Sequence, residues 1–195
     1  NGLVTGDSDV TVGQTSIGQT LTNNSSVTQT LVYTVTPTSG DQGTCIGNTF
    51  TVTIDVNPAP VIPTQTAEIC SEETFTDTLA DNPPTTIIPA GTTYLWTVGT
   101  NTNVTGQSDV ATSQTSISQT LTNLSNIIQT VVYTVTPTSG ADGNCIGDDF
   151  ILNVQVNPRP IIDDVTLTAI CSGEAFNHLP IQSGGDTSTD LVPAN

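Results

Sequence analysis

Apolar and polar residues alternate along several short stretches of the chain, and segments rich in Gly, Pro, Asn and Thr separate them. The alternation is clearest in residues 150–156, where Phe150, Leu152, Val154 and Val156 fall on one face. A period of two is typical of a β-strand that is buried on one side only. Short strands of this kind, divided by turn residues, predict an all-β sandwich.

The most complete set of strands lies between residues 61 and 158, where about seven are expected. Six have clear bounds: 64–70, 74–79, 92–98, 116–122, 131–136 and 150–156. In the third, Tyr94, Trp96 and Val98 share a face, and we expect this face to be buried because aromatic side chains dominate core energetics. The predicted core comprises Tyr94, Trp96, Ile117, Leu121, Tyr133, Phe150, Leu152 and Val154.

The sequence contains an internal repeat. Residues 4–60 align without gaps on residues 104–160, and 36 of the 57 aligned pairs are identical. Ile-Cys-Ser recurs at 69–71 and 170–172, so the period is 100 to 101 residues. This period is too long for one turn of a solenoid and suits a β-sandwich domain.

Proline pairs mark the expected domain boundaries. Residues 58–60 (Pro-Ala-Pro) and 158–160 (Pro-Arg-Pro) each follow an apolar strand, and proline cannot donate to a sheet ladder. We therefore expect residues 1–58 to be the C-terminal part of a first Ig-like repeat, 61–158 a complete repeat, and 161–195 the N-terminal part of a third.

Composition narrows the function classes. The 195 residues include 39 threonines, which suit half-exposed strands. There are 18 acidic residues but only one Lys or Arg, Arg159, and the formal net charge is -17. Nucleic acid and anionic membrane surfaces are bound through several basic side chains, so we exclude both as partners.

Further segments are expected outside this chain. No apolar run approaches the ~20 residues of a membrane-spanning helix, so no membrane insertion is expected within this segment. Because residue 1 falls inside a repeat, we expect the chain to be a piece of a longer exported protein whose export signal or anchor lies elsewhere.

Several motifs together resemble the PKD-like (Ig-like) repeats of very large surface adhesins of Bacteroidetes-type bacteria. They are Ile-Cys-Ser-Gly-Glu at 170–174, Pro-Ala-Gly-Thr-Thr-Tyr-Leu-Trp-Thr-Val at 89–98, Ser-Ile-Ser-Gln-Thr-Leu-Thr-Asn at 116–123, Val-Val-Tyr-Thr-Val-Thr-Pro-Thr-Ser-Gly at 131–140 and Val-Asn-Pro-Arg-Pro at 156–160. The resemblance implies tandem Ig-like/PKD-like β-sandwich domains of about 100 residues in an extracellular protein. It also places Trp96 where Ig-like domains bury a tryptophan.

Catalytic residues are scarce. His178 is the only histidine, and the aligned position in the complete repeat holds Asp77. A general base with an orienting partner is therefore not a repeated feature of the chain. We expect no enzyme activity and no cofactor.

Two acidic pairs and one threonine are candidate sites for a metal and for a modification. Asp148, Asp149, Asp163 and Asp164 are weak calcium candidates, because calcium prefers several oxygen ligands. The other repeat has no acidic residues at the aligned positions, so solvated loop acids are the preferred interpretation. Thr78, within Asp-Thr-Leu, resembles the O-glycosylation motif of Bacteroidetes-type secreted proteins.

Four cysteines in a chain expected to be exported favour disulfides over metal binding. The residues leave two arrangements open: Cys70–Cys145, or the local pairs Cys45–Cys70 and Cys145–Cys171, which close loops of ~25 residues. A simple Ig topology places Cys70 and Cys145 at opposite ends of the sandwich unless the 137–149 loop folds back. Similar modules carry one cysteine in each of these places, and this resemblance favours Cys70–Cys145.

The preferred function is that of a structural and adhesive repeat module in a long extracellular surface protein, a rod or filament that displays a distal binding site. Its expected partners are neighbouring repeats of the same chain and other copies in a filament, and the surface or glycan bound at the far end is not specified by the sequence. The alternatives are a glycan- or protein-binding sandwich module, and a filament subunit in which a strand of one copy completes the next.

Overall fold

A computed structural model describes residues 2–40, 43–162 and 164–177. Within these residues the chain forms β-strands and no helix. The predicted all-β fold class is confirmed. In the described part of the chain, no helix is long and apolar enough to cross a membrane.

Residues 61–158 form a sandwich of two sheets. Its strands are β5 (Gln65–Cys70), β6 (Glu73–Asp77), β7 (Thr93–Val98), β8 (Val104–Thr105), β9 (Val110–Gln114), β10 (Ile117–Asn123), β11 (Gln129–Thr138) and β12 (Phe150–Asn157). One sheet has the order β5-β12-β11-β7-β9 and the other β6-β10-β8. All strands of both sheets lie between Gln65 and Asn157.

The pairing of β5 with β12 sets the direction of the chain. These strands run parallel, from Gln65 beside Leu152 to Cys70 beside Asn157, whereas the other ladders of the sandwich are antiparallel. A parallel pair of first and last strands means that the chain enters the sandwich at one end and leaves it at the other.

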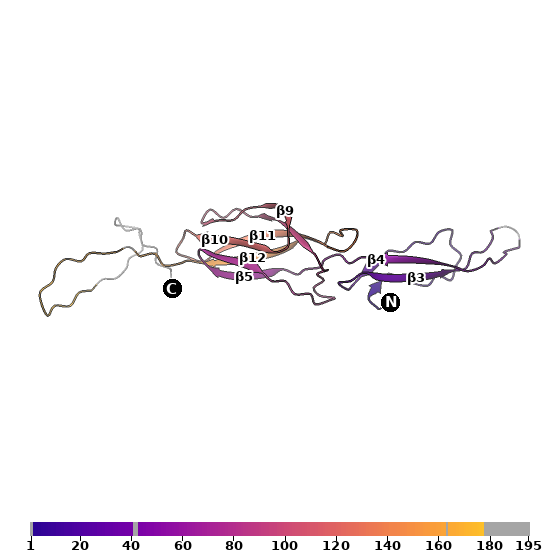
Figure 1. Ribbon diagram of the computed structural model, residues 1–195, viewed down its shortest axis with the longest axis horizontal. Coiled ribbons are helices and arrows are strands. Elements are labelled where there is room, and N and C mark those ends of the chain that lie inside the picture. Colours follow the sequence, from indigo (N-terminus) through magenta and orange to yellow (C-terminus); the bar gives the residue numbers. More distant parts are fainter. Residues whose placement is uncertain (1, 41–42, 163, 178–195) are drawn as a thin grey trace.

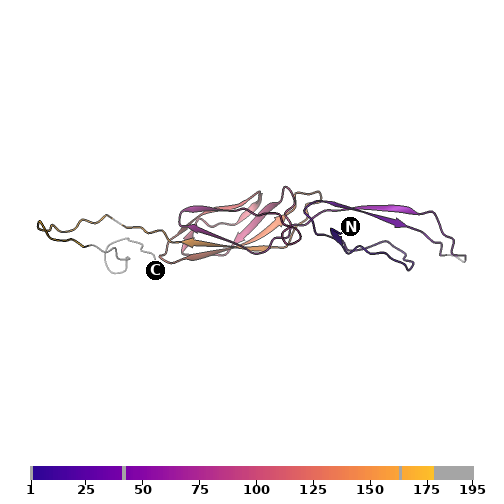
Figure 2. The same cartoon turned by 90° about the horizontal axis from the view of Figure 1, so that it is seen from below.

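The strands of residues 1–58 reproduce part of this arrangement. β1 (Val4–Thr5) pairs with β2 (Thr22–Asn23), and β3 (Gln29–Val35) pairs with β4 (Phe50–Val56). They match β8, the end of β10, β11 and β12. Figures 1 and 2 show the molecule extended along one axis, with the β3–β4 hairpin toward one end, the sandwich in the middle and residues 164–177 toward the other end.

Most of the predicted strands are present, with bounds that differ by one or two residues. Two strands were missed: β8 has only two residues, and β9 (Val-Ala-Thr-Ser-Gln) has no alternating apolar face. The side chains of β9 are exposed or half-buried because it is an edge strand that pairs only with β7. Such a strand leaves little hydrophobic signal in the sequence.

The core lies between the two sheets of the complete sandwich. All eight residues expected there are buried, and none exposes more than 6% of its surface. The ring of Tyr133 packs against that of Phe75 at 5.4 Å between centroids. Trp96 keeps its indole N–H satisfied by donating to the carbonyl of Ser108 at 3.1 Å.

The matching residues in the first repeat segment are far more exposed. Phe50 exposes 46% of its surface whereas Phe150 exposes 3%, and Ile54 exposes 37% whereas Val154 is fully buried. Residues 1–58 contain no counterparts of β5, β6 and β7. The hairpin of β3 and β4 therefore lacks the strands that flank β12 and β11 in their own sheet, β5 and β7, and it also lacks one strand of the facing sheet, β6.

Identical polar residues build the same hydrogen bonds in both copies. The Asn123 amide donates to the carbonyls of Ile127 and Val156, both at 2.8 Å, and Asn23 makes the equivalent pair of bonds at the same length. The Tyr133 hydroxyl donates to Gln119 Oε1 at 2.8 Å, and burial raises the pKa of Tyr133. Hydrogen bonds that are repeated in both copies therefore explain the identity at these polar positions.

We expect Trp96→Ala to destabilise residues 61–160 by about 3–5 kcal/mol, as large-to-small core changes do. That is a large share of the ~5–15 kcal/mol that stabilises a small domain. The urea midpoint measures the loss. Thr97→Ala, on the exposed side of the same strand, is the control and should cost less than about 1 kcal/mol. An unchanged midpoint in Trp96→Ala would place the indole outside the core.

Candidate functional site

The four cysteines are free thiols in the structure, so neither predicted arrangement of disulfides is formed. Cys70 lies beside Asn157, at the end of β12, whereas Cys145 precedes the start of β12. The eight residues of β12 span ~23 Å at about 3.3 Å per step. A disulfide needs Cα atoms within about 7 Å. The hairpin that carries Cys145 continues away from Cys70 instead of folding back, since Ser139 N–H donates to the Cys145 carbonyl at 2.9 Å.

The local pairs are separated as well. Cys45 and Cys70 have the whole of β4, the linker and β5 between them, and the chain runs along the molecule's long axis over this distance (Figure 1). Cys145 and Cys171 are separated in the same way by β12 and the following linker. Each end of the complete sandwich thus presents a single cysteine, and these two ends are the candidate functional sites.

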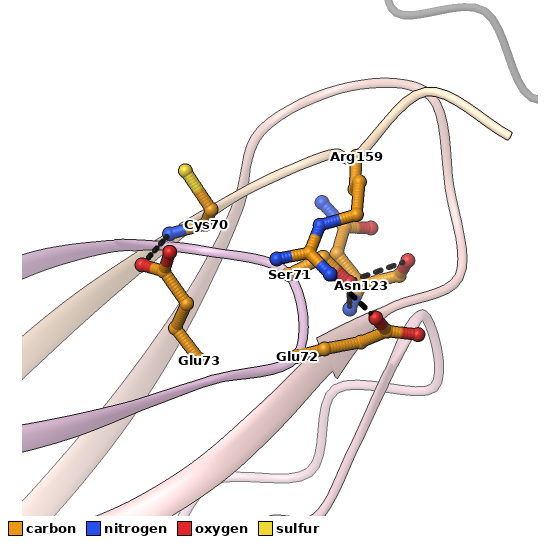
Figure 3. Close-up of polar contacts among 6 residues, drawn as sticks. All are labelled: Cys70, Ser71, Glu72, Glu73, Asn123 and Arg159. Carbon is orange, nitrogen blue, oxygen red and sulfur yellow. Dashed lines mark hydrogen bonds and ion pairs between the residues drawn. The ribbon is translucent and has the colours of Figure 1, made fainter.

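At the exit end, the turn after β5 is tied firmly to the sandwich. The Ser71 hydroxyl is buried and accepts a hydrogen bond from Asn123 N–H at 2.9 Å, while Ser71 N–H donates to the Asn157 carbonyl at 2.8 Å. The Cys70 N–H donates to the Glu73 carboxylate at 3.1 Å (Figure 3). The turn holds Cys70 at the surface beside the last residue of β12.

The linker that leaves the sandwich passes this turn. Arg159 forms an ion pair with Glu72 at 2.7 Å, and Figure 3 shows the guanidinium reaching from the linker to the turn. Both side chains are about half exposed, so the pair contributes at most about 1 kcal/mol. The Asn157 amide also donates to Glu68 Oε1 at 2.7 Å. These contacts fix the direction in which the chain leaves.

At the entry end, the loop between β11 and β12 packs on the preceding linker. The Asn57 amide donates to the Asp142 carbonyl. A Cβ atom on Gly147 would lie 2.2 Å from the Pro60 carbonyl oxygen, so only glycine permits this approach. Gly143 and Asn144, just before Cys145, have left-handed backbone conformations, with φ of 90° and 46°. Glycine and asparagine tolerate this conformation, which shapes the loop tip.

The burial of the two linkers differs because only one of them is covered by such a loop. Pro58 and Pro60 each expose less than 2% of their surface. Their counterparts in the second linker, Pro158 and Pro160, are half-buried and exposed. The loop of the following repeat therefore accounts for the burial of a linker, in addition to the residues of the sandwich that the linker enters.

The remaining predicted sites are not brought together. Asp148 and Asp164 are exposed, and Asp149 accepts a hydrogen bond from the Thr136 hydroxyl at 2.5 Å. No group of three or more His, Cys, Asp or Glu side chains that could hold a metal occurs in the described ranges. Thr78 is exposed directly after β6. Asp163 and His178 lie outside the described residues.

Asp77 occupies an unfavourable position beside a shallow surface pocket. Its Oδ2 atom is buried without a hydrogen-bond partner. The pocket is lined by Asp77, Thr78, Leu79, Ile88, Tyr94 and Ser116, among others. Burial raises the pKa of Asp77, and burial together with the negative charge of Asp77 raises the pKa of Tyr94. Asp77 and Tyr94 are the only titratable side chains among the residues that line this pocket.

The geometry defines an Ig-type sandwich module whose chain enters and leaves at opposite ends. Residues 1–60 and 67–160 match the family model of the PKD-like domain, so the chain belongs to the PKD-like domain family. A search of the curated proteins gave no match. PKD-like domains are generally non-catalytic and occur in extracellular proteins, which agrees with a structural module. The resemblance to the PKD-like (Ig-like) family is thereby confirmed.

The packing of the 137–149 loop on the linker was not predicted from the sequence. The signal was present in the Cys-Ile-Gly motif at 45–47 and 145–147 and in the linker prolines. Gly147 is required by contact with another repeat, and a repeat read in isolation gives no reason for it.

We expect Gly147→Ala to loosen the joint between residues 1–58 and the sandwich. The new methyl group would collide with the Pro60 carbonyl, so the loop must move off the linker. Nitrogen-15 relaxation of the 195-residue chain should then show residues 1–58 tumbling more independently. Gly47→Ala is the matched control: a Cβ atom there meets Pro37 at 3.1 Å, as one at Gly147 meets Pro137, but no linker atom within 4 Å. Equal effects of the two changes would contradict the assigned role of Gly147.

We expect Asp77→Asn to stabilise the protein at neutral pH. Because the folded-state pKa of Asp77 is raised, its protonated form favours folding, and stability is lost as pH rises from about 3.8 through that pKa. The asparagine variant remains uncharged and should lack this loss. Urea midpoints at pH 7 and pH 3 measure the difference, which should vanish at the lower pH. Asp148→Asn, at an exposed position, is the control.

Proposed function

We propose that the chain is a structural and adhesive repeat segment of a long extracellular surface protein. Residues 1–58, 61–158 and 161–195 would belong to successive repeats of a rod that displays a distal binding site. The observation that carries this proposal is the packed joint, in which Pro58 and Pro60 are buried and the 137–149 loop contacts the linker. A packed joint between modules with opposite entry and exit ends adds length and limits bending.

The chemistry of the surface supports a spacer. The formal net charge of -17 with a single Arg or Lys opposes self-association and non-specific contacts through mutual repulsion. The Thr side chains of the exposed strand faces supply polarity without charge, as in the Thr74–Thr120 hydroxyl pair at 2.6 Å. A cell-surface location follows from this proposal and from the extracellular setting of the family.

A glycan-binding module is less well supported. Sugar recognition in a sandwich commonly uses exposed aromatic rings as stacking platforms. Trp96, Tyr94 and Tyr133 are in the core, with exposed fractions of 5%, 6% and 0%. An enzyme is not proposed, because the described acids and hydroxyls do not converge on one pocket with a base and its orienting partner.

A strand-complemented filament is a second candidate, favoured by apolar side chains that lack a covering strand. Phe50 and Ile54 on β4 are exposed, as are Ile170 and Phe176 in the third repeat segment. Residues 170–172 match the end of β5 and the following turn, which are among the elements that residues 1–58 lack. In a continuous rod the adjoining sequence covers these residues, and in a filament another copy does.

Small-angle X-ray scattering tests the rod. Proteins of one, two and three successive copies of residues 61–160 should grow in maximum dimension by an equal step per copy. Compact or broadly distributed shapes would contradict a stiff array. The 195-residue chain separates the two candidates. If its copies join end to end as the concentration rises, and if this assembly is lost when residues 161–195 are removed, the filament is favoured.

A further inference from the structure

We propose that adjacent repeats are joined by a disulfide between the turn cysteine of one repeat and the loop cysteine of the next. In this numbering, Cys70 would pair with the counterpart of Cys145 in the following repeat. Cys145 would pair with the counterpart of Cys70 in the preceding one. The inference rests on the proposed tandem array and adds a covalent bond across each joint.

The turn cysteine lies beside the linker that leaves its own repeat. Cys70 is in register with Asn157, the last residue of β12, and is exposed. Its sulfur points away from the Glu73 carboxylate in Figure 3. The same turn recurs at Cys171, whose N–H donates to Glu174 at 2.9 Å just as Cys70 N–H donates to Glu73. Each repeat therefore presents a cysteine beside its own exit.

The loop cysteine lies in the loop that contacts the linker entering its repeat. Asn57, the counterpart of Asn157, contacts Asp142, and Pro60 contacts Gly147. Cys145 lies between these two contact points in the sequence. The loop cysteine of one repeat is thus placed beside residues 57–60, which follow the last strand of the repeat before it.

The two halves of the joint meet at this asparagine. The turn cysteine Cys70 lies beside Asn157, and the loop of the following repeat contacts Asn57, the counterpart of Asn157. Superposing the two asparagines brings a turn cysteine and a loop cysteine to the same short linker. The two cysteines of one repeat cannot meet there, because they lie at opposite ends of β12.

The bond forms by ordinary thiol–disulfide exchange with a disulfide oxidant such as oxidised glutathione. The Cys70 thiolate attacks the oxidant, a mixed disulfide forms, and one thiolate leaves. The loop cysteine thiolate then attacks the Cys70 sulfur and releases the second thiolate. Two protein thiols are oxidised to one disulfide, the oxidant is reduced to two thiols, and the two protons pass to the leaving groups. An extracellular setting permits such a bond to persist.

The test uses two copies of residues 61–160 in direct succession, which recreates the natural Pro60–Val61 junction as Pro160–Val61. In the test protein the first copy carries Cys145→Ser and the second Cys70→Ser, leaving the two cysteines that face the joint. In the matched control the first copy carries Cys70→Ser and the second Cys145→Ser, leaving two cysteines at the outer ends. Both are treated with oxidised glutathione and titrated with a maleimide.

We expect the monomeric test protein to lose both thiols and two hydrogen atoms in mass, with one cross-linked peptide after digestion. The control should form no intramolecular bond. Two free or glutathione-capped thiols in the test protein would overturn the proposal, and so would ring closure in the control. The 195-residue chain provides an independent check, because it should form no intramolecular disulfide among its four cysteines. A Cys70–Cys145 bond in that chain would also overturn the proposal.

X-ray scattering of the reduced test protein separates this proposal from the array itself. An extended tandem whose thiols do not pair would remove the disulfide and leave the array intact. A tandem without a fixed extended shape would contradict the array. Adding Gly147→Ala to the second copy should slow disulfide formation, because the loop no longer rests on the linker.

Discussion

The parallel pairing of β5 with β12 is the constraint on which the rest of the architecture depends. It places residue 61 and residue 158 at opposite ends of the sandwich, so successive repeats must extend in one direction. An antiparallel pair of first and last strands would have returned the chain to its starting end. The packed linker, the separation of the two cysteines and the elongated shape in Figures 1 and 2 all follow from this pairing.

Several of the identical residues in the two repeats make the same polar contacts in each copy. Asn23 and Asn123 each tie the turn before β3 or β11 to the last strand, and Gln19 and Gln119 each accept the hydroxyl of a tyrosine. Buried amides and hydroxyls are costly unless they are paired, so any replacement would leave an unsatisfied partner. Identity at such positions is explained by folding and does not require a bound ligand.

The strands and the core could be predicted from sequence, whereas the joints could not. Residues 150–156 alternate cleanly because β12 has one face on the core, and the same reasoning applies to Trp96 and its neighbours on β7. β9 was not predicted because an exposed edge strand has no alternating apolar face. The disulfides were assigned within the sequence at hand, although the structure leaves all four thiols free and spaces them a strand length or more apart. Contacts between repeats depend on backbone approaches, such as Gly147 to Pro60, that no periodicity reveals.

The arrangement of the first and last strands also determines how a repeat responds to a pulling force. A pull along the array acts on β5 at Gln65, toward the preceding repeat, and on β12 at Asn157, toward the following one. Because the two strands are neighbours, this force shears one strand past the other. The hydrogen bonds of the ladder from Gln65 to Cys70 then carry the force at the same time. A hairpin pulled from its open end would instead lose its bonds one after another. The repeat is thus built to resist stretching along the line from its entry end to its exit end.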